Sequence, residues 1–338
     1  MKFKELGKQV NPRVVGLTVV LILFALLFNS HWNGYFKFLS YDYVLNMLNR
    51  NIIGLYLTCS TTLLIIIGKF DFTMVSTISF AGTALSLYLS MGIPPAIAIV
   101  LMFCTAALVG CINAVMAYEL SIPSFISTMG FSTVLGGVTQ VVRMRVTRFD
   151  AIPLLTWLGT YEIAGRLPVR LVLTVVVIII YIFAVSFTRL GRSIQMIGGN
   201  PIAARNSGMN IRGVNYFLYI NSAVLAAIIA LLQMGLTGSN VSMGSRFGTF
   251  SGVMYALIGG ASLYGGSGSL AGSTLALLIV TVINTGLSYV GILQSWQGVL
   301  SEVLVLIIYA ICNLNVIGAI FSRIVKSFSA AKNRPIKK

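Results

Sequence analysis

Long runs of apolar residues alternate along this chain with short polar connections. A helix needs about 17–25 apolar residues to cross a bilayer, and the pattern predicts about ten such spans. They lie at 14–28, 46–67, 73–90, 94–117, 122–141, 167–187, 214–234, 250–264, 269–289 and 297–314. The run 250–264 is the weakest and is also compatible with a re-entrant segment. Because the runs are continuously apolar and do not alternate, they predict helices rather than barrel strands.

Composition agrees with a membrane location. Hydrophobic residues make up 57% of the chain and charged residues 9%, with a mean hydropathy of +0.93, whereas a soluble domain carries about a quarter charged residues. We therefore expect an all-α polytopic integral membrane protein, with residues 1–338 forming one transmembrane domain. The net charge of +16 does not indicate nucleic-acid binding, because the cations lie at the ends of apolar spans.

The distribution of cations predicts the orientation of the spans. Ten spans place both ends on one side, and the basic head and the basic tail at 315–338 place that side in the cytoplasm. The polar connection 188–213 then also faces the cytoplasm. One connection opposes this topology, because 142–166 faces outward on it and carries Arg143, Arg145, Arg148 and Arg166.

The connection 188–213 is the most distinctive polar segment. It carries Arg189, Arg192, Arg205 and Arg212 and no acidic residue. Within it the sequence predicts a short helix: Asn200 is a suitable N-cap, Pro201 suits the first helical position, and Gly208 suits the left-handed residue that ends a helix. The segment is either a docking element for a soluble partner or an ordinary cytoplasmic loop.

Two glycine-containing breaks interrupt the apolar pattern. The stretch 259–272 is rich in small residues that allow close helix packing, including Gly266, Gly268 and Gly272. An earlier break, at 68–76, also precedes a helix of small residues, which suggests a weak internal repeat of the kind transporters use.

Polar residues inside the spans are sparse, and each has two alternative roles. Either they form interhelical hydrogen bonds or they line a translocation pathway. The candidates are Asn113, Gln140, Asn221, Gln233, Asn284 and Glu302. Asp71, beside Lys69 at a helix start, either caps that helix and pairs locally or takes part in gating.

Three segments together resemble the membrane permease of ABC importers. They are Thr188-x-x-Gly-Arg192, Gly198-Gly-Asn-x-x-Ala-Ala-Arg-x-Ser-Gly208 and Ile258-Gly-Gly-Ala-Ser-Leu-x-Gly-Gly-Ser-Gly268. The likeness is strongest to ribose/xylose-type sugar permeases, which are related to permeases for branched-chain amino acids and nucleosides. The earlier break reads Gly68-Lys-Phe-Asp-Phe-Thr-Met-Val-Ser76; it keeps the family's aspartate as Asp71 but lacks two of its glycines.

The resemblance implies the ABC importer permease fold, a coupling helix seated in a cleft of a cytoplasmic ATPase, and a second permease chain, like or unlike. It also implies a soluble binding protein outside and a bacterial inner-membrane location. The residues it assigns to coupling are Gly199, Asn200, Pro201, Ala203, Ala204, Arg205, Ser207 and Gly208. A simple sugar is the leading substrate, with nucleosides or branched-chain amino acids as alternatives.

Missing motifs favour an energy source outside the chain. No Gly-x-x-x-x-Gly-Lys-Ser/Thr sequence is present to cradle ATP phosphates, so we expect ATP and Mg²⁺ to be bound by the partner ATPase and no cofactor or metal by this chain. An ion-coupled secondary transporter would need abundant paired charges within its spans, and the chain has only seven acids. A membrane enzyme would need a converging nucleophile, base or metal set, which a single histidine does not suggest.

Overall fold

The computed structural model describes residues 12–30, 40–143, 153–238 and 250–293, with a few further positions between 296 and 307. Its helices in the first half of the chain are α1 (Pro12–Ser30), α2 (Tyr41–Arg50), α3 (Ile52–Ile66), α4 (Met74–Ser90), α5 (Pro95–Ala114), the π-helix η2 (Val115–Glu119) and α6 (Ser124–Arg143). Those of the second half are α7 (Pro153–Thr160), α8 (Val169–Phe187), α9 (Arg189–Gly199), α10 (Pro201–Asn206), α11 (Ile211–Thr237), α12 (Ser251–Ile258) and α13 (Leu270–Tyr289). Two short antiparallel strands, β1 (Glu162–Ile163) and β2 (Leu167–Pro168), form a hairpin before α8.

The helical membrane fold predicted from the sequence is confirmed, but the number of spans is not. Among the described residues, five helices are long and apolar enough to cross a membrane, judged by length and composition: α5 with η2, α6, α8, α11 and α13. The predicted span 46–67 is divided at Asn51, which ends α2 and precedes α3. The predicted span 297–314 lies almost entirely outside the described residues.

The weakest predicted span, 250–264, contains only the eight-residue helix α12. The helix stops because Gly260 adopts a positive φ of 96° and the chain turns there, with Ala261 N–H bonded to Ala256 O. At about 1.5 Å per residue an eight-residue helix covers only about 12 Å. It is therefore too short to cross a bilayer by itself.

Helices α3 and α11 form the centre of the bundle. Every residue of α3 is buried, and α11 packs against α3, α4, α5 and α7. Glycines allow these close approaches: a Cβ at Gly110 would lie 2.7 Å from the Tyr219 carbonyl oxygen, and one at Gly235 would lie 2.0 Å from that of Leu155. Small residues thus bring backbones together here, as expected for helices packed in lipid.

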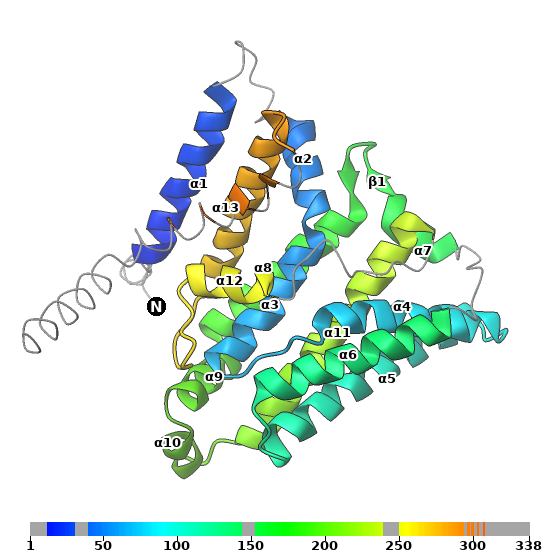
Figure 1. Ribbon diagram of the computed structural model, residues 1–338, viewed down its shortest axis with the longest axis vertical. Coiled ribbons are helices and arrows are strands. Elements are labelled where there is room, and N and C mark those ends of the chain that lie inside the picture. The colour runs from blue at the N-terminus through cyan, green and yellow to red at the C-terminus, as the bar shows by residue number, and fades with distance from the viewer. Residues whose placement is uncertain are drawn as a thin grey trace, which may run out of the picture.

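The hairpin and α10 lie at opposite ends of the molecule (Figure 1). Helix α8 connects them, since β2 directly precedes it and α9 directly follows it. Residues 161–168 and 188–213 are therefore at opposite ends of the bundle, as the predicted topology requires of the two connections to which they belong. Arg143 is exposed at the end of α6, whereas Arg145 and Arg148 lie outside the described residues.

Candidate functional site: the coupling segment and the α3–α4 break

The short helix predicted at 200–208 is confirmed in detail. Asn200 is the N-cap of α10, and its Oδ1 accepts a hydrogen bond from Ala203 N–H at 3.0 Å. Pro201 occupies the first position, and Gly208 has a φ of 77° just beyond the end. Such a cap contributes about 1 kcal/mol, which matters because a six-residue helix is not stable alone in water.

The surface of α10 differs from the expectation at one alanine. The resemblance assigns Ala204 to coupling, but this residue is buried among the apolar residues that pack around Leu218 and Ile197. That burial anchors α10 to its own chain. The other predicted coupling residues are exposed: Gly199, Asn200, Pro201, Ala203, Arg205, Ser207 and Gly208.

Sequence reasoning missed two features of this segment. Residues 189–199 form the helix α9, which begins where Thr188 Oγ1 accepts a bond from Leu190 N–H. Its buried Ile194 and Ile197 follow helical spacing and could have revealed it. The second feature is Ile202, a large apolar side chain that is 74% exposed on α10 in a segment rich in arginine.

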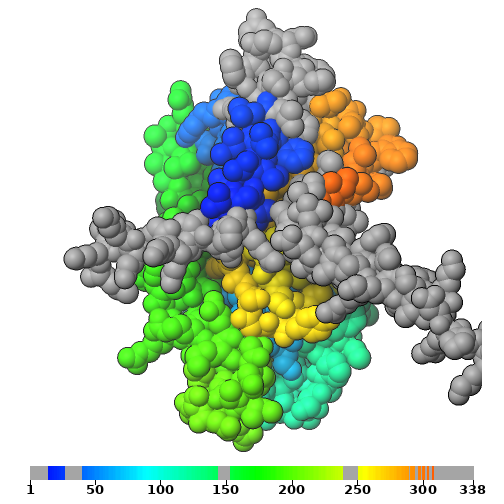
Figure 2. All heavy atoms as spheres, turned by 90° about the vertical axis from the view of Figure 1, so that its left-hand side faces the viewer, coloured from blue at the N-terminus to red at the C-terminus, as the bar shows by residue number. Residues whose placement is uncertain are grey.

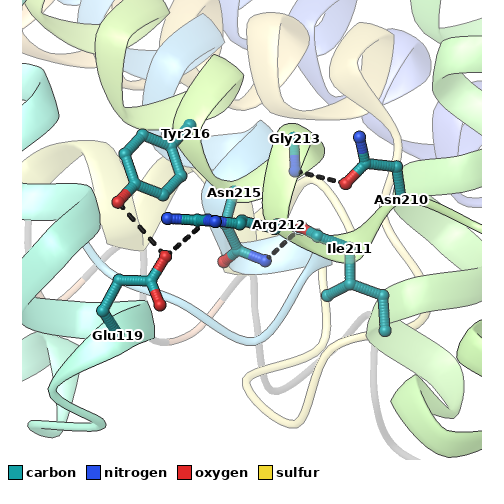
Figure 3. Close-up of polar contacts among 7 residues, drawn as sticks. All are labelled: Glu119, Asn210, Ile211, Arg212, Gly213, Asn215 and Tyr216. Atoms are coloured by element: carbon teal, nitrogen blue, oxygen red, sulfur yellow. Dashed lines mark hydrogen bonds and ion pairs between the residues drawn. The ribbon is translucent and has the colours of Figure 1, made fainter.

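Residues 188–208, which contain α9 and α10, are named the coupling segment after the role that the resemblance implies. An ion pair fixes the start of α11 beside this segment (Figure 3). Arg212 Nε lies 2.6 Å from Glu119 Oε1, and the Tyr216 hydroxyl donates to the same carboxylate oxygen at 3.3 Å. The N-cap Asn210 accepts from Gly213 N–H at 2.8 Å. The start of α11 is thus connected to η2, at the end of α5. Because the ion pair is largely exposed, it contributes modestly to stability.

The coupling segment meets the centre of the bundle at a crossing of three backbones. The end of α9, the end of α3 and the loop after α12 come together where Gly266 N–H donates to Ile66 O at 2.8 Å. A Cβ at Gly198 would lie 1.7 Å from Ile66 O, and one at Gly266 would lie 2.7 Å from Gly199 Cα. Only glycine fits these positions without displacing backbone.

The predicted break at 68–76 is an unwound segment between α3 and α4, and Asp71 is at its centre. Residues 67–73 are not helical, and Gly68 turns the chain with a φ of 73°. The buried Asp71 carboxylate accepts bonds from Thr73 N–H at 2.8 Å, Thr73 Oγ1 at 2.5 Å and Ser222 Oγ at 2.5 Å. Asp71 therefore ties the break to α11.

The local pairing considered for Asp71 is wrong. Lys69 does not reach Asp71; its Nζ donates instead to Ala117 O in η2 at 3.0 Å. Ala117 is in the last turn of its helix, where carbonyl groups lack helical partners, and Lys69 donates to one of these carbonyls. Asp71 is not the N-cap of α4 either, since that position is Thr73. It bonds the Thr73 N–H in a turn just before the helix.

The backbone of the break is held by side chains from two other helices, α6 and α11. Phe70 N–H donates to Ser124 Oγ at 3.0 Å and Phe72 N–H to Thr128 Oγ1 at 3.2 Å, both on α6. Tyr219 of α11 donates to Phe70 O at 3.2 Å. These bonds replace the helical bonds that the unwound segment lacks, as a non-helical segment at membrane depth requires.

Two of the other polar candidates make interhelical bonds. Asn113 donates from Nδ2 to Thr73 Oγ1 at 2.7 Å and so joins the network of Asp71, while its buried Oδ1 has no partner among the described residues. Asn221 accepts from the Tyr181 hydroxyl. Both contacts fit the packing reading, and neither excludes a place along the pathway.

Of the remaining candidates, those that the structure describes are not hydrogen-bond partners of Asp71. Gln233 is half-buried on α11, about 16 Å along the helix from Ser222. Asn284 is half-buried on α13, whose main neighbours are α1, α3 and α12. Gln140 is exposed on α6, Glu302 lies outside the described residues, and Gly268 packs against the Ile66 side chain.

Aromatic side chains that sequence reasoning did not single out cover one side of the break. The Phe72 ring lies 5.3 Å from that of Phe125 at the start of α6 and 5.0 Å from that of Phe250 just before α12, measured between ring centroids. Phe72 is buried, whereas Phe125 and Phe250 are exposed. The break is therefore apolar on this side and hydrogen-bonded on the other.

Comparison with known proteins places this architecture in a family. Residues 43–309 match the model of the permease component of branched-chain amino acid transport systems. The chain belongs to this permease family. The match includes both the α3–α4 break and the coupling segment.

Curated relatives of this permease are themselves permeases. It is 30% identical over 295 residues to Probable ABC transporter permease protein YphD of Escherichia coli K12, covering 87% of each chain. It is 32% identical over 253 residues to the autoinducer 2 import system permease protein LsrD of Enterobacter sp. 638, covering 73% of this chain and 77% of the relative. The ribose import permease protein RbsC of Haemophilus influenzae is 26% identical over 275 residues, with 80% and 84% covered.

The predicted ABC permease fold is supported by a solved structure. That protein, described as a metal-chelate type ABC transporter in an inward-facing conformation, aligns with a TM-score of 0.52 over 89% of this permease and 98% of its own chain. The sequences are only 13% identical, so the likeness concerns the fold and not the substrate. This permease is a multi-pass membrane protein of an ABC transporter.

Proposed function

We propose that this permease is the membrane subunit of an ATP-driven importer and that α10 is the surface on which a cytoplasmic ATPase acts. The observation that carries the proposal is a capped helix, anchored by Ala204, that presents Ile202 to solvent. Exposed Arg192 and Arg205 accompany it and would favour an acidic rim on the partner. ATP and Mg²⁺ would be bound by that partner.

The contacts of α10 suggest how movement would reach the pathway. Closure of an ATPase pair would displace α10 and the end of α9, which crosses the end of α3 at Ile66 and Gly266. The start of α11 follows α10 in the chain and contacts it, and the Arg212–Glu119 ion pair would carry its movement on to η2. Both routes lead to the break around Asp71, so its network would be rearranged between outward-open and inward-open states.

A simple sugar is the substrate class we propose. Two of the relatives are named for import of ribose and of autoinducer 2, while the family is named for branched-chain amino acids. A soluble binding protein would deliver the substrate outside the bacterial inner membrane, and both termini would be cytoplasmic. A thermal-shift screen of the cognate binding protein against pentoses, hexoses, nucleosides and branched-chain amino acids distinguishes these substrates.

Substitution of the exposed anchor tests the ATPase assignment. Ile202→Asp should leave membrane insertion intact but weaken ATPase binding about thirtyfold or more, the effect of removing an apolar hot spot. Binding is measured by co-purification of the ATPase with the permease from membranes. Ile163→Asp is the matched control, since Ile163 is an exposed isoleucine on β1 at the opposite end.

Two results would contradict the proposal. The first is normal ATPase co-purification with Ile202→Asp. The second is uphill solute accumulation by vesicles that contain the purified permease alone, because such transport would need an energy source within this chain.

A further inference from the structure

A second exposed surface lies beside α10, in the loop between α12 and α13. Tyr264 is 95% exposed and Leu263 is 48% exposed, although both lie in a loop otherwise composed of glycine, serine and alanine. Apolar side chains this exposed commonly mark a contact surface when they occur together. Neither residue was singled out from the sequence.

The loop is held rigidly. Ser262 N–H donates to Ser267 O at 3.0 Å and closes the loop on itself, and Tyr264 N–H donates to Ser262 Oγ at 3.2 Å. Gly265 and Gly266 have φ values of 84° and 80°, which glycine adopts without strain. The loop backbone is therefore ordered before any partner binds, which lowers the entropy cost of association.

This loop and the coupling segment form one continuous face. Gly266 lies against Gly199 at the end of α9, immediately before α10. The space-filling view agrees, since the yellow segment that contains α12 and the loop after it lies above the green segment that contains α9 and α10 (Figure 2). Ile202 and Tyr264 are thus presented by neighbouring segments that share backbone contacts.

We propose that the loop 262–266 is the second half of the ATPase-docking face, with Tyr264 seated in an apolar recess of the ATPase next to the one that receives Ile202. The inference rests on the proposed function of α10. Tyrosine is favoured at such anchor positions because it buries a large ring at low entropic cost. The partner surface would combine apolar recesses with carboxylates that face Arg192 and Arg205.

The ATPase is a better partner for Tyr264 than the lipid interface. Tyrosine also occurs where membrane spans meet water, but such an anchor needs no fixed backbone. Here the loop is locked to the end of α9 and to Ile66, so a force applied at Tyr264 would reach the same crossing as one applied at α10. A docking site for the ATPase requires such a mechanical link to the bundle, whereas a lipid anchor does not.

Cysteine protection tests the proposal directly. Single cysteines at Ile202, Tyr264 and, as a control at the opposite end, the exposed Tyr161 are placed in a permease freed of its four native cysteines. The permease is held in lipid nanodiscs, which leave both faces accessible, and is labelled with a polar maleimide with and without the ATPase. We expect the ATPase to slow labelling at 202 and 264 but not at 161. Unprotected labelling at 264 alongside protection at 202 would overturn the loop's role and leave that of α10 intact.

An affinity measurement provides the second test. Tyr264→Ala should weaken ATPase binding about tenfold, as expected for loss of a tyrosine anchor, whereas Tyr161→Ala should not. If only Ile202→Asp weakens binding, the loop is not part of the docking face. If neither variant does, the proposed function itself fails. If Tyr264→Ala instead loosens the membrane association of the loop at unchanged ATPase affinity, Tyr264 is an interfacial anchor and our inference is wrong.

Discussion

Asp71 organises the unwound segment because its carboxylate joins donors from two distant parts of the chain. It receives two donors from Thr73 and one from Ser222, which is 151 residues away in sequence. The network extends through Thr73 to Asn113 on α5. A buried acceptor that loses a partner costs about 1–3 kcal/mol, so this network contributes substantially to holding α4, α5 and α11 in register.

Two serine substitutions distinguish the contribution of the Asp71 network to stability from that of an ordinary bond within a helix. Ser222→Ala should lower the melting temperature of the purified permease, at a cost of about 1–3 kcal/mol, because Asp71 Oδ2 loses its donor. Ser86→Ala is the control: this buried hydroxyl bonds only within α4, to Gly82 O. Equal melting temperatures for the two variants would show that the Asp71 network adds no stability.

At the level of elements, the coupling segment is connected to the bundle by backbone contacts more than by side chains. Helix α9 ends against Ile66 and the loop after α12 with only glycines between them. Helix α10 adds the buried Ala204. Such contacts cannot be relieved by a change of rotamer, so displacement of α9 must displace the end of α3, from which the break continues.

One methyl group at this crossing should uncouple the segments. In Gly198→Ala the new Cβ would lie 1.7 Å from Ile66 O and 2.7 Å from Gly266 N, so the backbones must separate. Overpacking of this kind costs about 1–3 kcal/mol. We expect ATPase binding to persist, since α10 is unchanged, while stimulation of ATP hydrolysis by substrate-loaded binding protein is lost. Gly16→Ala is the control, because its new Cβ meets no neighbouring atom within 4 Å, and ATP hydrolysis should be stimulated normally in this variant. Normal stimulation in Gly198→Ala would show that the crossing does not transmit movement.

At the level of the whole molecule, α6 carries a stripe of small and polar residues beside exposed apolar ones such as Ile126 and Val134. Its exposed positions include Gly130, Thr133, Gly137 and Gln140 at helical spacing, and the three exposed glycines of α6 meet no atom within 4 Å. The exposed face of α8, by contrast, consists mainly of large apolar residues such as Ile179 and Phe183. Small and polar residues favour helix–helix contact in membranes, so we propose that a second permease chain packs on α6.

Cross-linking in membranes tests this arrangement. In a cysteine-free background, Thr133→Cys should cross-link oxidatively to a second permease chain, and Gly137→Leu should reduce the yield because it separates the helices. Ile179→Cys on the lipid-type face of α8 is the control and should stay uncross-linked. Comparable cross-linking from positions 133 and 179 would exclude α6 as the specific interface.

How far the sequence predicts this structure depends on how local the signals are. Helix α10 was predicted almost to the residue because Asn200, Pro201 and Gly208 each act on their own backbone. Helix α9 was missed because its polar residues outweigh the regular spacing of Ile194 and Ile197. The buried face of α9 is narrow, so the helical spacing of its few apolar residues is a weak signal among the polar ones.

The site at the break depends on contacts that no local pattern contains. The sequence indicates that the chain is interrupted near Asp71, but the partner of its second carboxylate oxygen is Ser222 on a distant helix. Lys69 shows the same limit, since it lies two residues from Asp71 yet bonds Ala117 in η2. Nothing in the sequence marked the π-helix that offers this carbonyl. The burial of Ala204 likewise depends on how α10 docks and not on its composition.

The all-glycine crossing has an evolutionary consequence. Three main chains touch here without side chains between them, so a single substitution cannot make a small adjustment to the contact. Gly198 is either kept, or the backbones around it must be rearranged. We therefore expect differences in speed or partner choice between relatives to arise at adjoining positions with side chains to vary, such as Lys69, Arg212 and Tyr264. Adaptation would act around this crossing while leaving the crossing itself unchanged.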